Sequence, residues 1–239
     1  MIQQLADTAS SVEYIFTEDG LTDNLGSPSE SAVDIVSGLS FRQGREVIVE
    51  NHAPGFHPRA NTPSPYPAII AHMQPFPKAS QLYVSSDLGG AAARLLADKM
   101  PKELGRVYIN RLSGEERVGV LTALASEREV GEVWMGHIGV DQLLGAANEL
   151  PTIRELRFTM TLPDSVEDAG SFVRTSLSSV TSHIRGLQCV ELRVDGTTAE
   201  QRASIETSVP VGTNIDSFTI RSISGYGGTW VTMTAVLNA

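Results

Sequence analysis

The first residues with the chemistry to bind a metal are histidines in a proline-rich segment. His52 and His57 lie five positions apart, Glu50 precedes them, and His72 follows downstream. Imidazole and carboxylate groups bind zinc, but zinc sites use characteristic ligand spacings that this segment does not reproduce. The sequence therefore predicts no metal and no cofactor, and it leaves the role of the three histidines open.

Polar side chains also follow three predicted strands, within residues 85–88, within residues 110–113 and at His137. The segment that begins at Asp87 has neither the glycine spacing of a dinucleotide loop nor a Walker lysine. His137 precedes Asp141 by four residues, but no nucleophile accompanies them, and no G-x-S-x-G motif occurs. We therefore predict a protein without enzymatic activity. The alternative is an α/β enzyme with its active site at these strand ends, and a deep pocket there would favour it.

The elements that position these side chains form a repeat. A six-residue phrase with apolar residues at its first, fourth and sixth places occurs five times, and a helix-patterned segment follows each of the first four copies. The copies begin at Leu104, Val130, Ile153, Leu187 and Ile215. The first two intervals, 26 and 23 residues, fall within the leucine-rich-repeat range of about 20–29. The next two, 34 and 28 residues, indicate longer helices in some units.

Alternation within each phrase predicts which faces of the sheet are covered. Val107 and Ile109 flank Tyr108, and the later strands interleave apolar with polar residues in the same way. A doubly wound sheet is covered on both faces, so its central strands are apolar on both sides. We therefore predict a parallel sheet with helices on one side only. The turn residues and the following β-patterned run in residues 217–239 predict an antiparallel hairpin that covers an open sheet edge.

These phrases resemble the leucine-rich-repeat superfamily, most closely the long β-α units of ribonuclease-inhibitor-like proteins and of divergent fungal F-box proteins. The resemblance covers about residues 82–220 well and residues 12–73 loosely. Most units lack the Asn or Cys that follows the strand in this family, and no F-box segment is found. The resemblance implies one α/β domain over 1–239, a curved solenoid with the parallel sheet concave and the helices convex. Its parts are irregular repeats in 1–80, regular repeats in 81–222 and a capping hairpin in 217–239.

Residues between the apolar strand positions are expected on the uncovered face, where Trp, Tyr and Arg are typical of binding hot spots. We predict that this face binds another protein, and the family resemblance implies substrate recognition for a ubiquitin ligase. The alternative is that Trp134 packs under a loop while the arginines pair with acids on a solvated face. The predicted binding residues are Tyr83, Tyr108, Asn110, Trp134, Arg157, Thr159, Glu191, Arg193 and Arg221.

Net charge and cysteine content limit the classes of partner and the cellular compartments that we expect. The 239 residues carry a net charge of −10, which disfavours nucleic acid and anionic membranes because both attract clustered Lys and Arg. Cys189 is the only cysteine, so no intrachain disulfide forms, and we expect its thiol to be buried and inert. The N-terminus lacks the pattern of a signal peptide. We therefore expect a cytoplasmic or nuclear protein that binds neither nucleic acid nor membrane, with its oligomeric state open.

Overall fold

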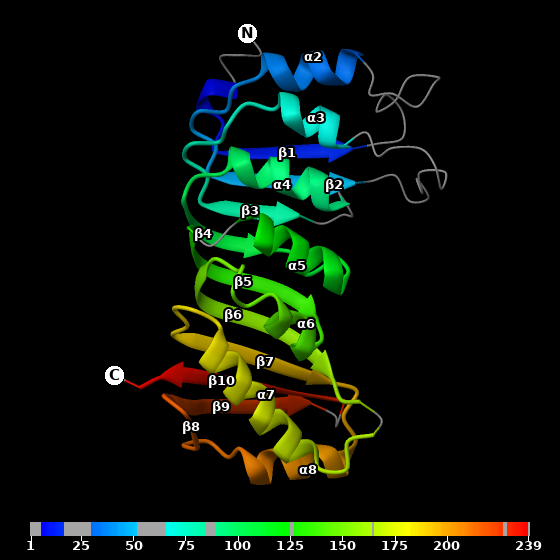
Figure 1. Ribbon diagram of the computed structural model, residues 1–239, viewed down its shortest axis with the longest axis vertical. Coiled ribbons are helices and arrows are strands. Elements are labelled where there is room, and N and C mark those ends of the chain that lie inside the picture. Colours follow the sequence, from blue (N-terminus) through cyan, green and yellow to red (C-terminus); the bar gives the residue numbers. More distant parts are fainter. Residues whose placement is uncertain are drawn as a thin grey trace.

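Most of the strands follow one another through the sheet in chain order (Figure 1). The computed structural model describes residues 6–16, 30–51, 66–84, 89–124, 127–163, 165–226 and 229–238. The strands are β1 (Ser11–Phe16), β2 (Glu46–Asn51), β3 (Gln81–Val84), β4 (Glu103–Tyr108), β5 (Glu129–His137), β6 (Thr152–Thr161), β7 (Cys189–Asp195), β8 (Asn214–Ile215), β9 (Phe218–Tyr226) and β10 (Trp230–Leu237).

The helices alternate with the parallel strands and lie over one face of the sheet (Figure 1). They are α2 (Glu30–Gly38), α3 (Tyr66–His72), α4 (Gly89–Lys99), α5 (Gly114–Ala123), α6 (Val140–Gly145), α7 (Ala169–His183) and α8 (Ala199–Ser208). The sequence patterns Ser113-Gly-Glu-Glu116 and Thr198-Ala-Glu-Gln201 predict capping boxes, and both are confirmed, because each Ser or Thr side chain accepts a hydrogen bond from the third helical residue. Ser27-Pro-Ser-Glu30 predicts a third capping box, but Ser27 lies outside the described residues.

The buried side of the sheet shows why the alternating phrases form these strands. Neighbouring strands align one apolar residue of each, and every member of this line is at most 1% exposed. The line runs through Val47, Leu82, Val107, Val133, Leu156 and Val190. A slip of one residue would move these side chains to the uncovered face, so burial fixes the register. The predicted α/β class with a mostly parallel sheet is confirmed.

The C-terminal hairpin forms as predicted, but its place in the sheet differs. The order is β1-β2-β3-β4-β5-β6-β7-β10-β9-β8, so β10 inserts antiparallel between β7 and β9. The phrase beginning at Ile215 is not a fifth repeat, and that prediction was wrong. Ile215 ends β8, Phe218 begins the antiparallel β9, and Asp216 turns between them with a φ of 52°. Apolar spacing alone does not separate a strand from a tight turn.

Arginine side chains donate hydrogen bonds to backbone carbonyl groups in loops before and after the strands. Arg117 is only 7% exposed and donates to the carbonyl oxygens of Ile109 (3.2 Å) and Asn110 (3.0 Å). Burial lowers the pKa of Arg117. Arg128 and Arg185 likewise donate to carbonyl oxygens in the loops before β4 and before β6. Buried loop carbonyls need such partners, and long arginine side chains provide them.

Candidate binding surface and strand-end pocket

A single row of paired residues crosses the face of the sheet that the helices leave uncovered. Register places Ile48, Tyr83, Tyr108, Trp134, Arg157, Glu191 and Thr234 side by side, one from each of seven neighbouring strands. We call Tyr83, Tyr108, Trp134, Arg157 and Glu191 the central row. All five side chains are partly buried, which means that each keeps some surface in contact with solvent.

Side chains of the central row stack on one another. The rings of Tyr83 and Tyr108 are parallel within 3° with centroids 4.2 Å apart, and Trp134 follows at 5.5 Å with a 47° tilt. The Arg157 guanidinium lies 4.6 Å from the Trp134 ring centroid. Burial of the phenol, assisted by Tyr108, raises the pKa of Tyr83 to about 12, so its hydroxyl stays protonated and donates to Gln81 at 2.9 Å. The row is therefore a fixed stack that presents ring edges and hydroxyl groups.

Glu132 anchors this stack from the adjacent row. Its carboxylate is about 10% exposed and accepts hydrogen bonds from the indole Nε1 of Trp134 at 2.7 Å and from Arg157 at 2.8 Å. Arg106 reaches its second oxygen at 3.0 Å. Arg157 also lies 3.6 Å from Glu191. Three donors on one buried carboxylate fix both the tilt of the indole and the position of the guanidinium.

A second polar cluster lies farther along the strands, at β5, β7 and β10. Arg193 contacts the Asp195 carboxylate at 2.5 Å, and its guanidinium lies 4.9 Å from the Trp230 ring centroid. His137 approaches the other Asp195 oxygen at 3.2 Å. A β-bulge at Gly136, whose φ is +67°, shifts the register so that His137 pairs with Thr159. The bulge aims His137 toward β7.

The structure brings most of the predicted binding residues together. Five form the central row, and Thr159 and Arg193 pair in the row beside it. Asn110 follows β4 and borders a small hollow of about 280 Å³ with Tyr83, Tyr108 and Trp134. Arg221 falls outside the rows, because the register shift between β9 and β10 leaves it without an opposite residue. The ion pairs expected from the solvated-face alternative are also present, so both interpretations share the same contacts.

Sequence reasoning missed Glu132, which holds the centre of this surface. The signal was available, because Glu132 precedes Trp134 by two residues and adjacent same-face positions in a strand differ by two. Cys189 departs from expectation as well. It lies on the uncovered face, partly buried beside Glu155, and burial raises the pKa of its thiol. The thiol expected to be buried is only partly buried, and its raised pKa disfavours the reactive thiolate.

A larger pocket opens at the carboxyl ends of β5 and β6, with a volume of about 680 Å³. Ser113 and His137, both in segments where an enzyme site was the alternative, line it. The open sheet face favours protein binding, and the strand-end pocket favours the enzyme alternative. The molecule has both features. Residues 85–88, His52 and His57 lie outside the described residues, and His72 is exposed at the end of α3. The described part of the chain contains no group of three potential metal ligands.

Comparison of the chain with protein-family models, curated proteins and solved structures finds no match in any of the three. Within the residues that the structure describes, no helix combines the length and the apolar character needed to cross a membrane. The function of this surface must therefore be argued from its own geometry.

Proposed function

We propose that the chain is a non-enzymatic interaction module that binds another protein on the uncovered face of its sheet. The observation that carries this proposal is the central row: two stacked tyrosine rings and a tilted indole, followed by an arginine and a carboxylate in continuous contact. Tyr, Trp and Arg dominate the energetics of protein interfaces. Here they are neighbours on one face rather than scattered singly.

Fixed side chains make the row suitable for binding. Ordering a flexible side chain at an interface costs about 0.5–1.5 kcal/mol, and that cost is smaller where the free protein already holds the side chain. Trp134 is held by Tyr108, Arg157 and Glu132 before any partner arrives. These contacts neutralise charge, as they would on a solvated surface. They also hold the side chains of the central row in place for a partner.

The stacking geometry selects against flat ring ligands such as sugars. The faces of Tyr83 and Tyr108 cover one another, and Arg157 lies over Trp134, so little ring face remains free along the row. Ring edges and hydroxyl groups remain, and these contact side chains and backbone of a protein. Carboxylates of Glu13, Glu46, Glu132, Glu155, Glu191 and Asp195 outnumber the arginines on this face, which favours a partner with basic side chains.

The finer assignment rests on the resemblance to leucine-rich repeats. Parallel strands in chain order with helices on one face are compatible with such a solenoid. On that basis we propose a curved sheet, a cytoplasmic or nuclear location and a role in recognising substrates for a ubiquitin ligase of the F-box type. The binding proposal does not depend on this assignment, because it rests on the central row.

The test is capture of partners from native lysate by the wild-type chain and by a Trp134→Ala, Arg157→Ala variant, with retained proteins identified by mass spectrometry. A matched control replaces Arg94 and Arg174, which are exposed on α4 and α7 in the helix layer. We expect a protein retained by the wild type and the control but lost by the central-row variant. Circular dichroism establishes that all three chains are folded.

Two results would contradict the proposal. One is a partner that the helix-layer control loses while the central-row variant keeps it, which would move binding to the opposite face. The other is the absence of any specifically retained protein in lysates where the chain itself is present. Direct titration of the identified partner against each variant then measures the affinity change, with at least about 2 kcal/mol expected for a hot-spot pair.

A further inference from the structure

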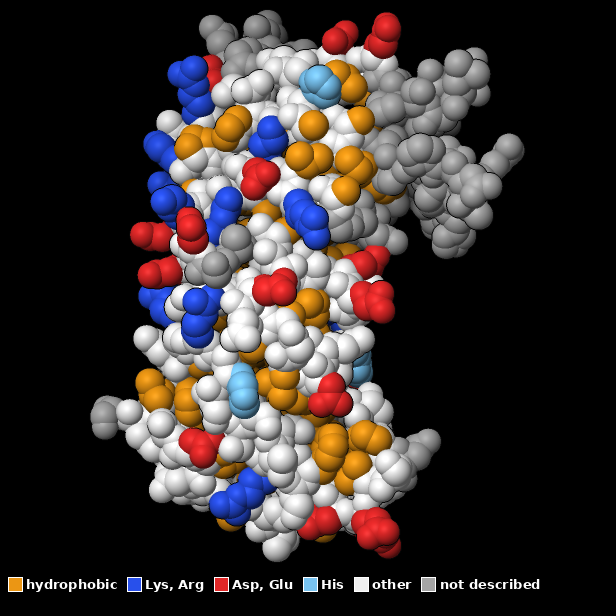
Figure 2. Space-filling model, in the orientation of Figure 1, with side chains coloured by type: hydrophobic (Ala, Val, Ile, Leu, Met, Phe, Trp, Pro, Cys, Tyr) orange, Lys and Arg blue, Asp and Glu red, His pale blue; other side chains and the backbone are white. Residues whose placement is uncertain are grey.

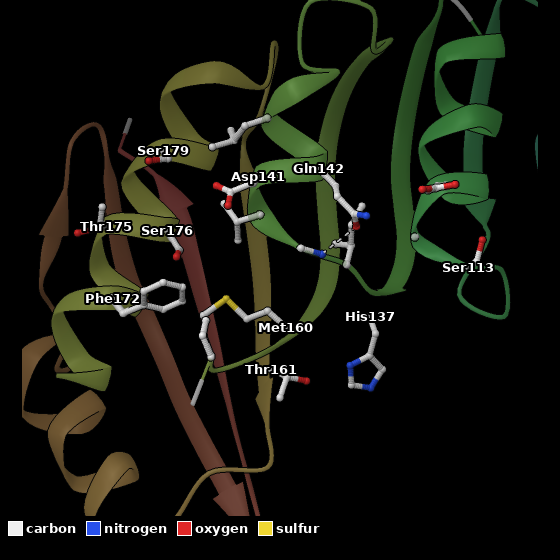
Figure 3. Close-up of a pocket in the computed structure, with 17 residues that line it drawn as sticks. Ser113, His137, Asp141, Gln142, Met160, Thr161, Phe172, Thr175, Ser176 and Ser179 are labelled. Atoms are coloured by element: carbon white, nitrogen blue, oxygen red, sulfur yellow. Dashed lines mark hydrogen bonds between the residues drawn. The ribbon is translucent and has the colours of Figure 1, made fainter. Parts of the chain in front are cut away.

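The pocket at the carboxyl ends of β5 and β6 has the dimensions of a small-molecule site. Its volume of about 680 Å³ lies in the range of about 300–1,000 Å³ that is typical of ligand pockets. It opens between α6 and α7, with the ends of the two strands beneath (Figure 3). Crevices at the carboxyl ends of parallel strands are where open α/β sheets bind ligands.

One part of the pocket is apolar. Met160 is 3% exposed at the end of β6, and the partly buried Phe172 ring of α7 lies beside it. Figure 3 shows the Phe172 ring and the Met160 side chain pointing toward each other from these two elements. Val140 and Leu144 of α6 also line the pocket. A thioether and a phenyl ring together suit an aromatic or short aliphatic body.

A buried polar group faces this apolar region. Ser176 is only 6% exposed, lines the pocket from α7 and points toward Met160 (Figure 3). Its hydroxyl lines the pocket and is not among the buried polar atoms of the described chain that lack a hydrogen-bond partner. The Ser176 side chain therefore presents a hydroxyl, which both donates and accepts hydrogen bonds, to a ligand in the pocket.

The charges around the pocket determine which ligand charge is favourable. Glu115 and Asp141 line it from the first turns of α5 and α6, and the described lining residues include no Lys or Arg. His137, at its border, is paired with Asp195. Figure 2 shows Lys and Arg side chains concentrated along the left edge of the molecule, at the amino ends of the parallel strands, with Asp and Glu predominating at the right edge. The pocket opens on that acidic edge.

Helix ends do not reverse this preference. Helix amino ends attract anions through free N–H groups, but Ser113 caps α5, and α6 is a short helix that carries Asp141 in its first turn. Ser113 accepts from the backbone N–H of Glu116, and the Glu116 carboxylate accepts from the backbone N–H of Ser113. Gln142 accepts from the backbone N–H of Gly139 at 3.4 Å, as the dashed line in Figure 3 marks. An anionic ligand would therefore meet a carboxylate in the first turn of each helix, Glu115 in α5 and Asp141 in α6.

We propose that this pocket binds a small organic amine. The apolar body packs on Met160 and Phe172, and the ammonium group lies at Asp141 with the Ser176 hydroxyl as a hydrogen-bond acceptor. In Figure 3 the Asp141 carboxylate points from α6 toward α7, on the side where Ser176 lies. This site is separate from the central row, so it stands whether or not a protein binds the sheet face.

The test uses 2-phenylethylamine as the probe, with the anion 3-phenylpropionate and the neutral 2-phenylethanol, which carry the same phenylethyl body, as comparisons. The chain carries six methionines, and ¹³C-methyl labelling reports on each. We expect the amine to shift the Met160 methyl resonance in a saturable manner at millimolar concentration, and the anion to bind about tenfold more weakly. Ser176→Leu fills the pocket and should abolish the shift, while the other five methyl resonances establish that the variant is folded.

Matched charge variants separate a local contact from general attraction. Asp141→Asn should weaken amine binding about three- to fivefold, whereas Asp98→Asn, which removes one exposed carboxylate from α4, should leave it within about twofold. Equal losses in the two variants would reduce the site to nonspecific electrostatics and overturn the proposal. So would equal affinity for the amine and the anion, or an unshifted Met160 resonance in the wild type at about 20 mM amine.

Discussion

Replacement of Glu132 by glutamine tests whether one buried carboxylate holds the central row together. The side chain is isosteric, so packing is retained while the negative charge is lost. Trp134 and Arg157 both donate to Oε1, and Arg106 donates to Oε2. A glutamine oxygen placed at Oε1 still serves the first two donors, but its amide then faces the Arg106 guanidinium, donor against donor.

The expected loss of stability follows from these contacts. Hydrogen bonds to charged groups contribute about 1.5–3 kcal/mol when buried, and exposed ion pairs contribute about 0–1 kcal/mol. Arg106 and Arg157 keep 52% and 35% of their side-chain surface in solvent, so water compensates part of the loss. We therefore expect Glu132→Gln to lower the free energy of unfolding by about 1–2 kcal/mol, and the urea midpoint by roughly 0.5–1 M.

The matched control is Glu155→Gln. Glu155 pairs with Glu132 across β5 and β6 on the same face but is exposed, so its replacement removes the same charge from nearly the same place. Its free energy of unfolding should stay within about 0.5 kcal/mol of the wild type. Because Glu132 is buried, the difference between the variants should persist in 0.5 M salt, where interactions between exposed charges are largely screened. An unchanged midpoint for Glu132→Gln, or equal losses in both variants, would refute the anchoring role.

Three further predictions concern single positions. The buried Tyr14 hydroxyl has no hydrogen-bond partner in the described chain, so Tyr14→Phe should raise the free energy of unfolding by about 1 kcal/mol at pH 7 in urea titrations. Burial also raises the pKa of Tyr14 to about 12. The free energy of unfolding of the wild type should therefore decrease between pH 10 and 12, and the phenylalanine variant should show a smaller decrease over that range. Iodoacetamide at pH 8 should alkylate Cys189 at least about tenfold faster in the unfolded than in the folded chain, measured by mass spectrometry; equal rates would contradict the raised thiol pKa. Gly136→Ala should lower the free energy of unfolding by at least about 2 kcal/mol, because its φ is +67° and an added Cβ would lie 2.7 Å from the Asn110 carbonyl oxygen. Gly119→Ala, in the interior of α5, should raise the free energy of unfolding by about 0.5–1 kcal/mol. Thermal melts compare the two variants.

Local patterns were sufficient for the strands that lie between helices. In β4 through β7 every apolar phrase position is buried, and the residues between them share the opposite face. The period of two fixes the face, and burial of one face fixes the register, so the members of the central row were predictable from spacing. Tyr108 and Trp134 pair as the phrase alignment requires.

Position within the sheet was not predictable in the same way at the C-terminal end. The alternation in residues 230–237 predicts a strand, but nothing local selects its neighbours. β10 pairs with both β7 and β9, so the choice depends on contacts far apart in the chain. The strand-end pocket was missed for a related reason. In the sequence, nothing distinguishes Ser176 from other serines of an amphipathic helix. The packing of α7 beside α6 buries it next to Met160.

The burial of Glu132 supports the proposal that the open face binds a partner. A surface that only balances charge in solvent leaves its carboxylates exposed, because removing one from water costs several kcal/mol unless donors replace the water. Glu132 is about 10% exposed and has three donors, whereas Glu191 keeps 37% of its side chain in solvent. The buried carboxylate fixes Trp134 and Arg157 in one arrangement, at a cost that charge balance alone does not require. Such fixation is useful where a partner must find these side chains already in place, which is why the central row is the surface to test first.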